Sequence, residues 1–365
     1  MLLIDNALAA QNLSMQECID AQERAFRGLL SGASMLRPRI DMYVPCERDD
    51  GYYRWGSTEG AFDGMLAIRL KSDVVTWPRS VEGDSNGRKY ALRPGLYCGL
   101  IFLFSTDNGE PLAILNDGVI QQMRVGAAAG IGANYLARKN ARVVGMIGSG
   151  GMARTSLEAF CAVRDIKCVR IFSRSRDNRE RFAHEMGERL KLEVKPVASA
   201  RSAIQGADIV ATCTDSMEPV FDATWLEPGM HVTNVARREI SDAAFARFDV
   251  VIAHGVEGVP IPESNDFQIG IAGSPGAYIA GSAEQRKRLP SRKPGFGEQE
   301  PPVLTDLMAG KASGRTNEVQ ITHYRNIGNH GLQFVADAGV LYRKVRELNL
   351  GRDLPTEWFM QDIRN

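Results

Sequence analysis

Short apolar runs alternate with stretches of helical spacing between residues 142 and 255 of the chain. A short apolar run suits a buried strand, and apolar residues that recur every three or four positions suit a helix. Strands are predicted at 143–147, 168–172, 194–197, 209–214, 230–235 and 250–254, and helices at 154–163, 177–190 and 200–205. This alternation predicts an α/β fold with a parallel, doubly wound sheet.

The first 115 residues show a different pattern, in which one helix is followed by strands of period two. The helix is predicted over 15–30, because Ser14 and Glu17 form a capping box ahead of its apolar face. In the strand predicted at 65–75, the period of two places Arg69 and Lys71 on the same face. The other elements predicted are strands at 2–4, 40–44, 96–105 and 111–115, a loop at 80–94, and a helix at 119–136.

The segment 256–303 is rich in glycine and proline and shows no helical or strand period. A loop of this length is usually a lid, a binding loop or disordered. Its basic cluster at 286–293 suits a solvated face better than a nucleic-acid site. Beyond it we predict a helix at 304–308, a strand at 318–322 and a long helix at 331–348.

Composition narrows the class of protein. The 365 residues suggest about two domains, and equal counts of 44 basic and 44 acidic residues give no electrostatic support for binding nucleic acid or an anionic membrane. The six cysteines are scattered without a C-x-x-C pair, which favours a reducing compartment over disulfides or a zinc site. Without a signal-peptide pattern or an apolar run long enough to span a bilayer, a cytoplasmic location is expected, and no metal site is predicted.

A glycine-rich turn follows the strand at 143–147, in the sequence Gly148-Ser149-Gly150-Gly151-Met152-Ala153. Gly148 suits a tight turn because it has no Cβ, Gly150 lets a ligand approach, and Ala153 lets the helix pack on the strand. The N–H groups at the helix start, around Gly151 and Met152, favour a pyrophosphate. With a strand before it and a helix after it, this motif predicts a dinucleotide site.

The end of the next strand bears on which cofactor binds. NAD-specific sites usually carry Asp or Glu at this point, but this chain has Ser173, Arg174 and Ser175. Hydroxyl and guanidinium groups suit a 2′-phosphate, so the sequence favours NADP(H), with NAD(H) and a merely solvated loop as alternatives. Three residues at the carboxyl ends of later strands are also expected to face the nucleotide: Thr212, Thr214 and Val235.

Arg124 lies in the N-terminal half of the helix predicted at 119–136. The helix dipole disfavours a cation near a helix start. This position favours a role for Arg124 in binding a ligand anion, and an ordinary salt bridge is an equal alternative.

The chain resembles the ornithine cyclodeaminase/mu-crystallin family. The stretches that carry the resemblance are 110–118 (EPLAILNDG), 123–128 (MRVGAA), the turn at 148–153, 212–214 with 218–219, and 318–337. The resemblance implies a homodimer whose subunit has a substrate-binding and dimerisation domain, 1–125 plus 325–365. It also implies a Rossmann domain at 126–324 that carries the long loop at 256–303. Known members reduce imines or imino acids with NAD(P)H, dehydrogenate amino acids, or cyclise ornithine with bound NAD and loss of ammonia.

The resemblance also assigns roles to single residues. Arg39 and Arg124 match arginines that bind the substrate carboxylate, which a guanidinium binds through two hydrogen bonds. The family's lysine falls in the strand at 65–75, at Arg69 or Lys71. An arginine stays charged, so Lys71 is the preferred proton donor. Two residues near the C-terminus match positions beside the nicotinamide: Arg325 and Asn326.

One departure from the family separates the candidate reactions. In ornithine cyclodeaminases the loop after the strand at 230–235 carries an Asp that acts on the amine, and residues 235–240 (VARREI) contain none. Asp215 and Glu239 are the acids that could replace it. The leading hypothesis is an NAD(P)H-dependent oxidoreductase acting on a C=N or CH–NH bond next to a carboxylate. A cyclodeaminase-type ammonia lyase with bound NAD and a non-catalytic NADP(H)-dependent binder are the alternatives.

Overall fold

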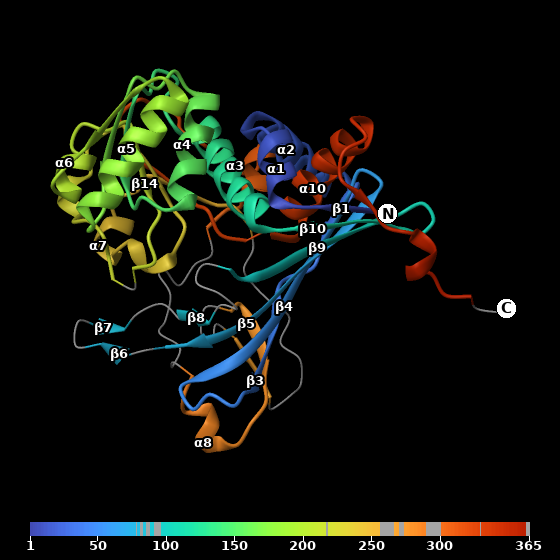
Figure 1. Cartoon of the computed structure of the whole chain (residues 1–365). Helices are drawn as coiled ribbons and strands as arrows, with labels where there is room; N and C mark the ends of the chain where they lie inside the picture. The colour runs from blue at the N-terminus through green and yellow to red at the C-terminus, as the bar shows by residue number, and fades with distance from the viewer. Residues whose placement is uncertain are drawn as a thin grey trace. The chain divides into compact units, whose positions relative to one another are not determined.

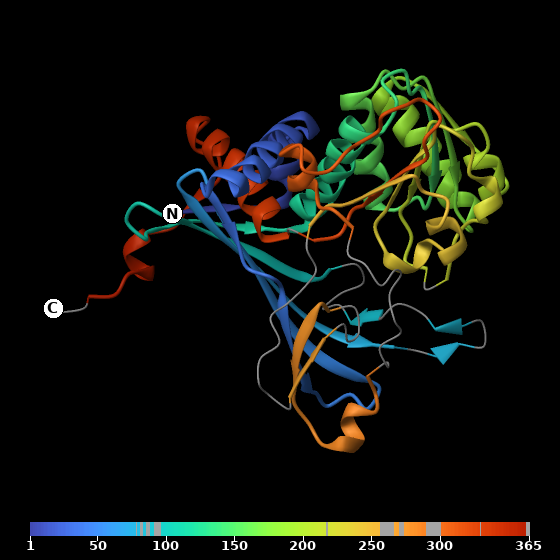
Figure 2. The same cartoon turned by 180° about the vertical axis from the view of Figure 1, so that it is seen from behind.

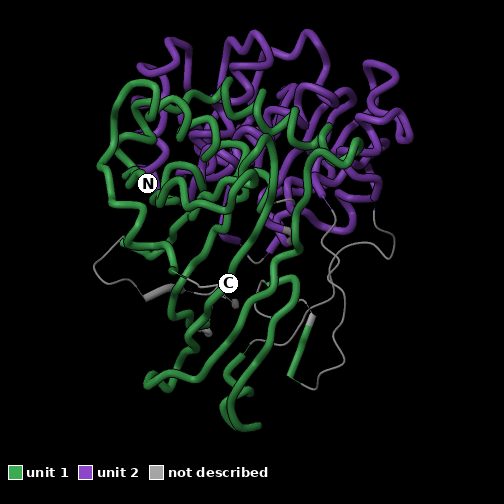
Figure 3. The backbone as a smooth tube through the Cα atoms, turned by 90° about the vertical axis from the view of Figure 1, so that its right-hand side faces the viewer, with its two compact units in different colours: residues 1–121, 257–293, 329–365 green, residues 122–256, 294–328 purple. Residues whose placement is uncertain are grey.

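The chain forms two compact units, which Figure 3 separates by colour. Unit 1 comprises residues 1–121, 257–293 and 329–365, and unit 2 comprises residues 122–256 and 294–328. This computed structural model describes residues 1–77, 79–80, 83–84, 88–90, 96–216, 218–255, 266–269, 274–289, 301–328 and 330–362. Each unit contains one large β-sheet.

The sheet of unit 1 is mixed, with eleven strands among the described residues. The strand order is β17-β18-β3-β4-β5-β9-β10-β1-β20, while β2 pairs with β4 and β8 with β5. The long strands β4 and β5 form the antiparallel pair in its middle (Figure 1). The bounds are β1 Leu2–Ile4, β2 Ser34–Leu36, β3 Ile40–Pro45, β4 Gly51–Phe62, β5 Met65–Thr76, β8 Arg88–Tyr90, β9 Cys98–Ser105, β10 Pro111–Asn116, β17 Phe267–Ile269, β18 Gly276–Ile279 and β20 Arg352–Asp353. A separate hairpin pairs β6 Arg79–Ser80 with β7 Gly83–Asp84.

Helix α10 packs on β4 and β5, and α2 packs on α10. The helix and sheet approach closely at Gly331, where a Cβ would lie 1.9 Å from the carbonyl oxygen of Glu59. The capping box predicted for α2 is confirmed, since Ser14 and Glu17 each accept a hydrogen bond from the other's backbone N–H. The helices of unit 1 are α1 Asn6–Asn12, α2 Met15–Ser31, α8 Ala283–Arg286, α10 His330–Glu347 and the 3-10 turn η3 Thr356–Phe359.

Unit 2 has the parallel, doubly wound sheet that the sequence predicts, in the order β13-β12-β11-β14-β15-β19-β16. Every neighbouring pair in it is parallel. The strands are β11 Val143–Ile147, β12 Cys168–Phe172, β13 Glu193–Pro196, β14 Ile209–Thr212, β15 His231–Asn234, β16 Val250–Ala253 and β19 Thr322–Arg325. The helices are α3 Gly118–Leu136, whose first residues belong to unit 1, α4 Gly151–Val163, α5 Arg176–Leu190, α6 Ala200–Ile204, α7 Asp242–Phe245, α9 Leu304–Met308, η1 Ala223–Trp225 and η2 Arg237–Glu239.

Two apolar clusters form the core of unit 2. One packs α3, α4 and α5 against the strands through residues such as Ala133, Phe160 and Phe182. The other packs α6 and α7 against them through Ile204 and Ala244. Helices therefore cover both faces of this sheet, as the green and yellow ribbons of Figures 1 and 2 show.

The structure corrects the prediction for the segment 256–303. Its described parts are not a structureless loop: they form β17, β18 and α8, and β18 pairs in parallel with β3. The pairing is stabilised by burial, because Ala277 and Ile279 pack with Tyr43 and Tyr52 in a small apolar cluster. Residues 257–293 accordingly belong to unit 1, although the sequence predicted an insertion in the Rossmann domain.

Other differences are local. The strand predicted at 318–322 starts at Thr322, because the Arg315 guanidinium and the Asn317 side chain hold residues up to Gln320 in a turn. The segment 80–94 includes short strands, of which β8 pairs with the end of β5. Helix α1 was not predicted. Among the described residues, none of the helices has the length and apolar character needed to cross a membrane.

Candidate active site

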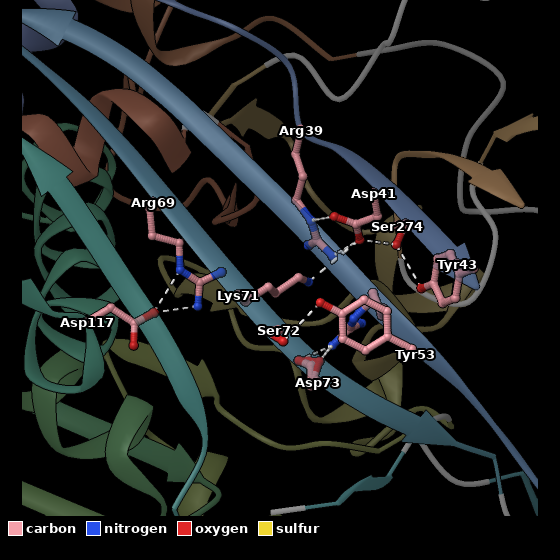
Figure 4. A network of polar contacts seen from close by, with 11 residues as sticks. Arg39, Asp41, Tyr43, Tyr53, Arg69, Lys71, Ser72, Asp73, Asp117 and Ser274 are labelled. Carbon is pink, nitrogen blue, oxygen red and sulfur yellow. Dashed lines mark hydrogen bonds and ion pairs between the residues drawn. The ribbon is translucent and has the colours of Figure 1, made fainter. Parts of the chain in front are cut away.

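One face of the unit 1 sheet brings Asp41 and Lys71 together across a glycine. In the register of β3, β4 and β5, Asp41 lies beside Gly56, and Gly56 lies beside Lys71. Directly paired residues point to the same face of a sheet, so these three positions share a face. A Cβ at Gly56 would lie 2.0 Å from an oxygen of Asp41 and 3.1 Å from Cε of Lys71. Only glycine therefore leaves room for the two side chains to meet (Figure 4).

Asp41 is the centre of a buried network. Its fully buried carboxylate accepts hydrogen bonds from Nε of Arg39 at 2.9 Å, from Nη2 of Arg39 and from the Ser274 hydroxyl. Nζ of Lys71 lies 3.6 Å from the same carboxylate, and the Tyr43 hydroxyl lies 2.9 Å from that of Ser274. Burial acts to raise the pKa of Asp41, but Arg39, Lys71 and Ser274 hold that pKa well below its ordinary value.

Lys71 is a buried amine, with 6% of the residue exposed. Its pKa lies well below that of an ordinary lysine, chiefly because burial penalises the ammonium form. Arg39 and Arg54 repel the charge and lower the pKa further, whereas Asp41 and Asp73 attract it. A lysine with a lowered pKa releases its proton more readily, so Lys71 is suited to acid–base chemistry.

Two other arginines on this face are each paired with an aspartate. Nη2 of Arg54 donates to both oxygens of Asp73, at 2.9 and 2.8 Å. Arg69 donates from Nε and Nη2 to one oxygen of Asp117, at 2.7 and 2.5 Å, and its guanidinium lies over the Phe334 ring. Since Arg69 is held by Asp117, the geometry favours Lys71 over Arg69 for proton transfer.

The glycine-rich turn of unit 2 has the features that a dinucleotide requires. Gly148 has φ +104°, and a Cβ there would lie 2.3 Å from the carbonyl oxygen of Cys213. A Cβ at Gly150, the N-cap of α4, would meet no described atom within 4 Å, and Gly150 makes no side-chain cap hydrogen bond. Packing explains Gly148 but not Gly150. The turn and the N–H groups of residues 151–153 therefore fit a pyrophosphate.

The three residues predicted to select the cofactor follow directly after β12. Ser175 is the N-cap of α5 and accepts a hydrogen bond from Asn178 N at 3.2 Å. The Ser173 hydroxyl donates to the Ser175 carbonyl at 3.0 Å, and Arg174 is exposed. A strand end with hydroxyls and a guanidinium but no carboxylate fits a 2′-phosphate.

Glu239 is a buried structural anchor. Its Oε1 accepts from N and Oγ1 of Thr214 at 2.6 and 2.7 Å, and its Oε2 accepts from Val235 N at 3.1 Å and Ala236 N at 2.9 Å. Burial raises the pKa of Glu239 in spite of these hydrogen bonds. The fully buried carboxylate is therefore occupied by three backbone N–H groups and one hydroxyl of the protein itself. It fixes the ends of β14 and β15, where Thr214 and Val235 are predicted to face the nucleotide.

Arg124 lies on α3 and is buried, with 9% of the residue exposed. Asn326 donates from Nδ2 to the Val125 carbonyl at 2.9 Å, and its own N–H donates to the Asn234 carbonyl at 3.3 Å. Asn326 thus connects the end of β15 to the turn of α3 that carries Arg124. Arg325, the last residue of β19, is also buried.

The predicted residues divide between the units. Arg39, Arg69 and Lys71 belong to unit 1, and Arg124 belongs with the cofactor residues to unit 2. In the part of the chain that the structure describes, no group of three or more His, Cys, Asp or Glu side chains is placed to hold a metal ion.

Sequence reasoning missed Asp41 and Ser274. A signal for Asp41 exists, since Arg39, Asp41 and Tyr43 alternate with a period of two and therefore share a face. Ser274 gives no such signal, because it is 233 residues from its partner Asp41 in the chain and lies in the segment predicted to be a loop.

The sequence of the chain matches the model of one protein family. The profile described as Ornithine cyclodeaminase/mu-crystallin family matches residues 4–247. The chain belongs to this family. The match covers β3 to β5 of unit 1 and the glycine-rich turn and cofactor strands of unit 2 up to residue 247. It therefore includes Asp41 and Lys71, whereas Ser274, Arg325 and Asn326 lie beyond it.

Its relatives in this family include reductases and a dehydrogenase. The Delta(1)-pyrroline-2-carboxylate reductase of Bacillus cereus is 28% identical over 261 residues, which is 70% of this chain and 74% of that protein. The alanine dehydrogenase of Archaeoglobus fulgidus is 27% identical over 346 residues, 93% of each protein. The solved Thermococcus litoralis Delta(1)-pyrroline-2-carboxylate reductase, in complex with NADH and L-proline, is 27% identical with a TM-score of 0.73, and the match covers 97% of this chain and all of that one.

Proposed function

We propose that this protein is an NAD(P)H-dependent oxidoreductase that reduces a C=N bond next to a carboxylate, or runs the reverse dehydrogenation of an amino acid. The observation that carries the proposal is the buried amine of Lys71, which shares a sheet face with Asp41, the carboxylate that binds Arg39, in a chain of this family. Relatives named as pyrroline-2-carboxylate reductase and alanine dehydrogenase support the same reaction class.

We assign carboxylate binding and proton transfer to separate residues. Arg39 and Arg124 bind the substrate carboxylate. Asp41 already accepts from Nε and Nη2 of Arg39, so the donors left for the substrate are the N–H groups of Nη1 and the second N–H of Nη2. Lys71 donates a proton from Nζ to the imine nitrogen and becomes a neutral amine, which its lowered pKa favours. The nicotinamide, when bound, supplies the hydride that the imine carbon accepts. Proton and hydride together convert C=N into CH–NH.

The cofactor proposed is NADP(H), with NAD(H) as the alternative. Support comes from the strand end after β12, where exposed Arg174 and the hydroxyls of Ser173 and Ser175 stand without a carboxylate.

We further propose a homodimer. The sheet face opposite Asp41 exposes Met42, Val44 and Tyr278, and an apolar sheet face of this kind suits burial against a second copy.

The lyase alternative has less support. Residues 235–240 contain no Asp, and Glu239 is held by four hydrogen bonds. A lyase that recycles NAD would release ammonia from ornithine without net consumption of reduced cofactor.

The test begins with calorimetric titration of NADPH and NADH on protein checked for bound nucleotide. We expect tighter binding of NADPH, and for Arg174→Ala a selective loss of about tenfold, the size of one charged hydrogen bond. Turnover is then measured with Delta(1)-pyrroline-2-carboxylate, and with pyruvate plus ammonia. Tightly retained NAD together with ammonia release from ornithine would instead identify a lyase, and absence of turnover on every imine tested would favour a binding protein.

A further inference from the structure

The segment after β16 lies beyond the family match, which ends at residue 247. Its described part joins the sheet of unit 1, where Gly276–Ile279 pairs in parallel with Ile40–Tyr43. Ser274, two residues before that strand, is 2% exposed and donates to the Asp41 carboxylate. We propose that this segment is a working part of the reaction site: through Ser274 it holds Asp41, which in turn positions Arg39 and Lys71. The inference rests on the proposed function, because it takes Lys71 as the proton donor.

The chemistry of the groups fixes the direction of each hydrogen bond. The carboxylate of Asp41 only accepts, so the one proton of the Ser274 hydroxyl is given to Asp41. Ser274 then has only lone pairs to offer Tyr43, so the Tyr43 hydroxyl donates to Ser274 at 2.9 Å. Both hydroxyls thus act toward Asp41, and all three side chains are buried. A directed chain of this kind holds a buried carboxylate in one position.

The position of Asp41 matters for two groups. It holds the Nε and Nη2 edge of Arg39, which sets the plane of that guanidinium. It also stands 3.6 Å from Nζ of Lys71. The charged groups that face Lys71 are Arg39 before β3, Asp41 on β3, Arg54 on β4 and Asp73 on β5 itself. Two cations oppose its ammonium form and two carboxylates support it, so a displaced Asp41 leaves the cations dominant.

The hydrogen bond between Ser274 and Asp41 could also serve only to hold residues 274–279 on the sheet. The experiment has to distinguish this structural role from the proposal. A structural role changes stability and leaves the proton affinity of Lys71 in the folded protein unchanged. The proposal requires that loss of the Ser274 hydroxyl lowers the proton affinity of Lys71 in the folded enzyme.

The experiment compares Ser274→Ala, Tyr43→Phe and Asp41→Asn with the control Ser72→Ala. Ser72 neighbours Lys71 on β5, but its hydroxyl bonds to Tyr53 on the opposite face. Titration of the ¹⁵N-labelled Lys71 amine by NMR, assigned by its loss in Lys71→Arg, needs no substrate. Imine reduction is measured from pH 5 to 10.

We expect Ser274→Ala to lower kcat/KM about tenfold and Asp41→Asn about a hundredfold, as for loss of one and of several charged hydrogen bonds. The Lys71 titration should move to lower pH in the same order, with Tyr43→Phe smallest and Ser72→Ala unchanged. A folded Ser274→Ala protein with an unchanged Lys71 titration would overturn the proposal, whatever its kcat/KM. If Asp41→Asn does not fold, the Lys71 titrations of Ser274→Ala and Tyr43→Phe test the proposal without it. A pH profile that is the same in Lys71→Arg as in the native enzyme would refute the role of Lys71 instead, whatever the NMR titration shows.

Discussion

The two units use buried charge in opposite ways. In unit 2, Arg164 donates to the carbonyl oxygens of Ala133, Ala137 and Arg138 at the end of α3, and Glu239 accepts from three backbone N–H groups. In unit 1, Asp41 and Lys71 interact on their shared face with charged or hydroxyl side chains. A buried charge that bonds to backbone fixes loop shape, whereas a buried charge among other charges has its proton affinity set by them. The comparison predicts different consequences for mutations in the two units.

The largest effect is expected for Lys71→Met, which keeps the length of the side chain and removes the amine. Turnover of the imine should fall by about 10²- to 10⁴-fold, the range of a lost general acid. In the reductive direction the protonated amine is the acid. The native rate should therefore fall as pH rises through the lowered pKa of Lys71, and the variant should lose that limb. The exposed Lys195→Met is the control. Native-like turnover by Lys71→Met would mean that the buried charges of unit 1, like those of unit 2, have only a structural role.

Arg124→Ala tests whether unit 2 also supplies a group that binds substrate. A guanidinium bound to a carboxylate through two hydrogen bonds contributes about 10²-fold in affinity. We expect KM for the imino acid to rise by about that factor, while calorimetry shows NADPH affinity changed less than about twofold. Loss of NADPH affinity in place of substrate affinity would mean that Arg124 serves the cofactor.

A smaller effect is expected for Glu239→Gln, an isosteric change. The amide offers one oxygen where the carboxylate offers two, so its NH₂ group must face N–H donors at Thr214 or at Val235 and Ala236. The displaced loops should raise KM for the cofactor about tenfold, with little change in the position of the pH limb that Lys71 sets. Steady-state kinetics, with cofactor and imine concentrations varied in turn across the pH range, distinguishes a change in cofactor KM from a shift of the pH limb. A shift of the pH limb without a change in cofactor KM would place Glu239 among the reactive groups.

The parts of the fold that could be predicted are those with local causes. Most strands and helices of unit 2 follow from apolar period, although α7 was not predicted and β19 starts later than predicted. The turn at Gly148 follows from the conformation that only glycine adopts readily. The face shared by Arg69 and Lys71 follows from the pleat. Contacts between distant strands could not be derived, because the pairing that puts Gly56 between Asp41 and Lys71 depends on register across three strands. The contact of Ser274 with Asp41 was the hardest to predict, because it depends on the pairing of β18 with β3, which lie far apart in the chain.

The division of unit 1 among three separate stretches of chain has a consequence for biosynthesis. During translation, residues 1–121 leave the ribosome long before 257–293 and 329–365, which complete the same unit. Until β18 and α10 arrive, β3 has one open edge and β4 and β5 lack the helix that covers them. The sheet of unit 2 is also incomplete until late in synthesis, because β19 lies between β15 and β16 in the sheet but follows both in the chain. The nascent protein therefore exposes apolar sheet surface for most of its synthesis, and chaperone demand should be highest before the last hundred or so residues emerge.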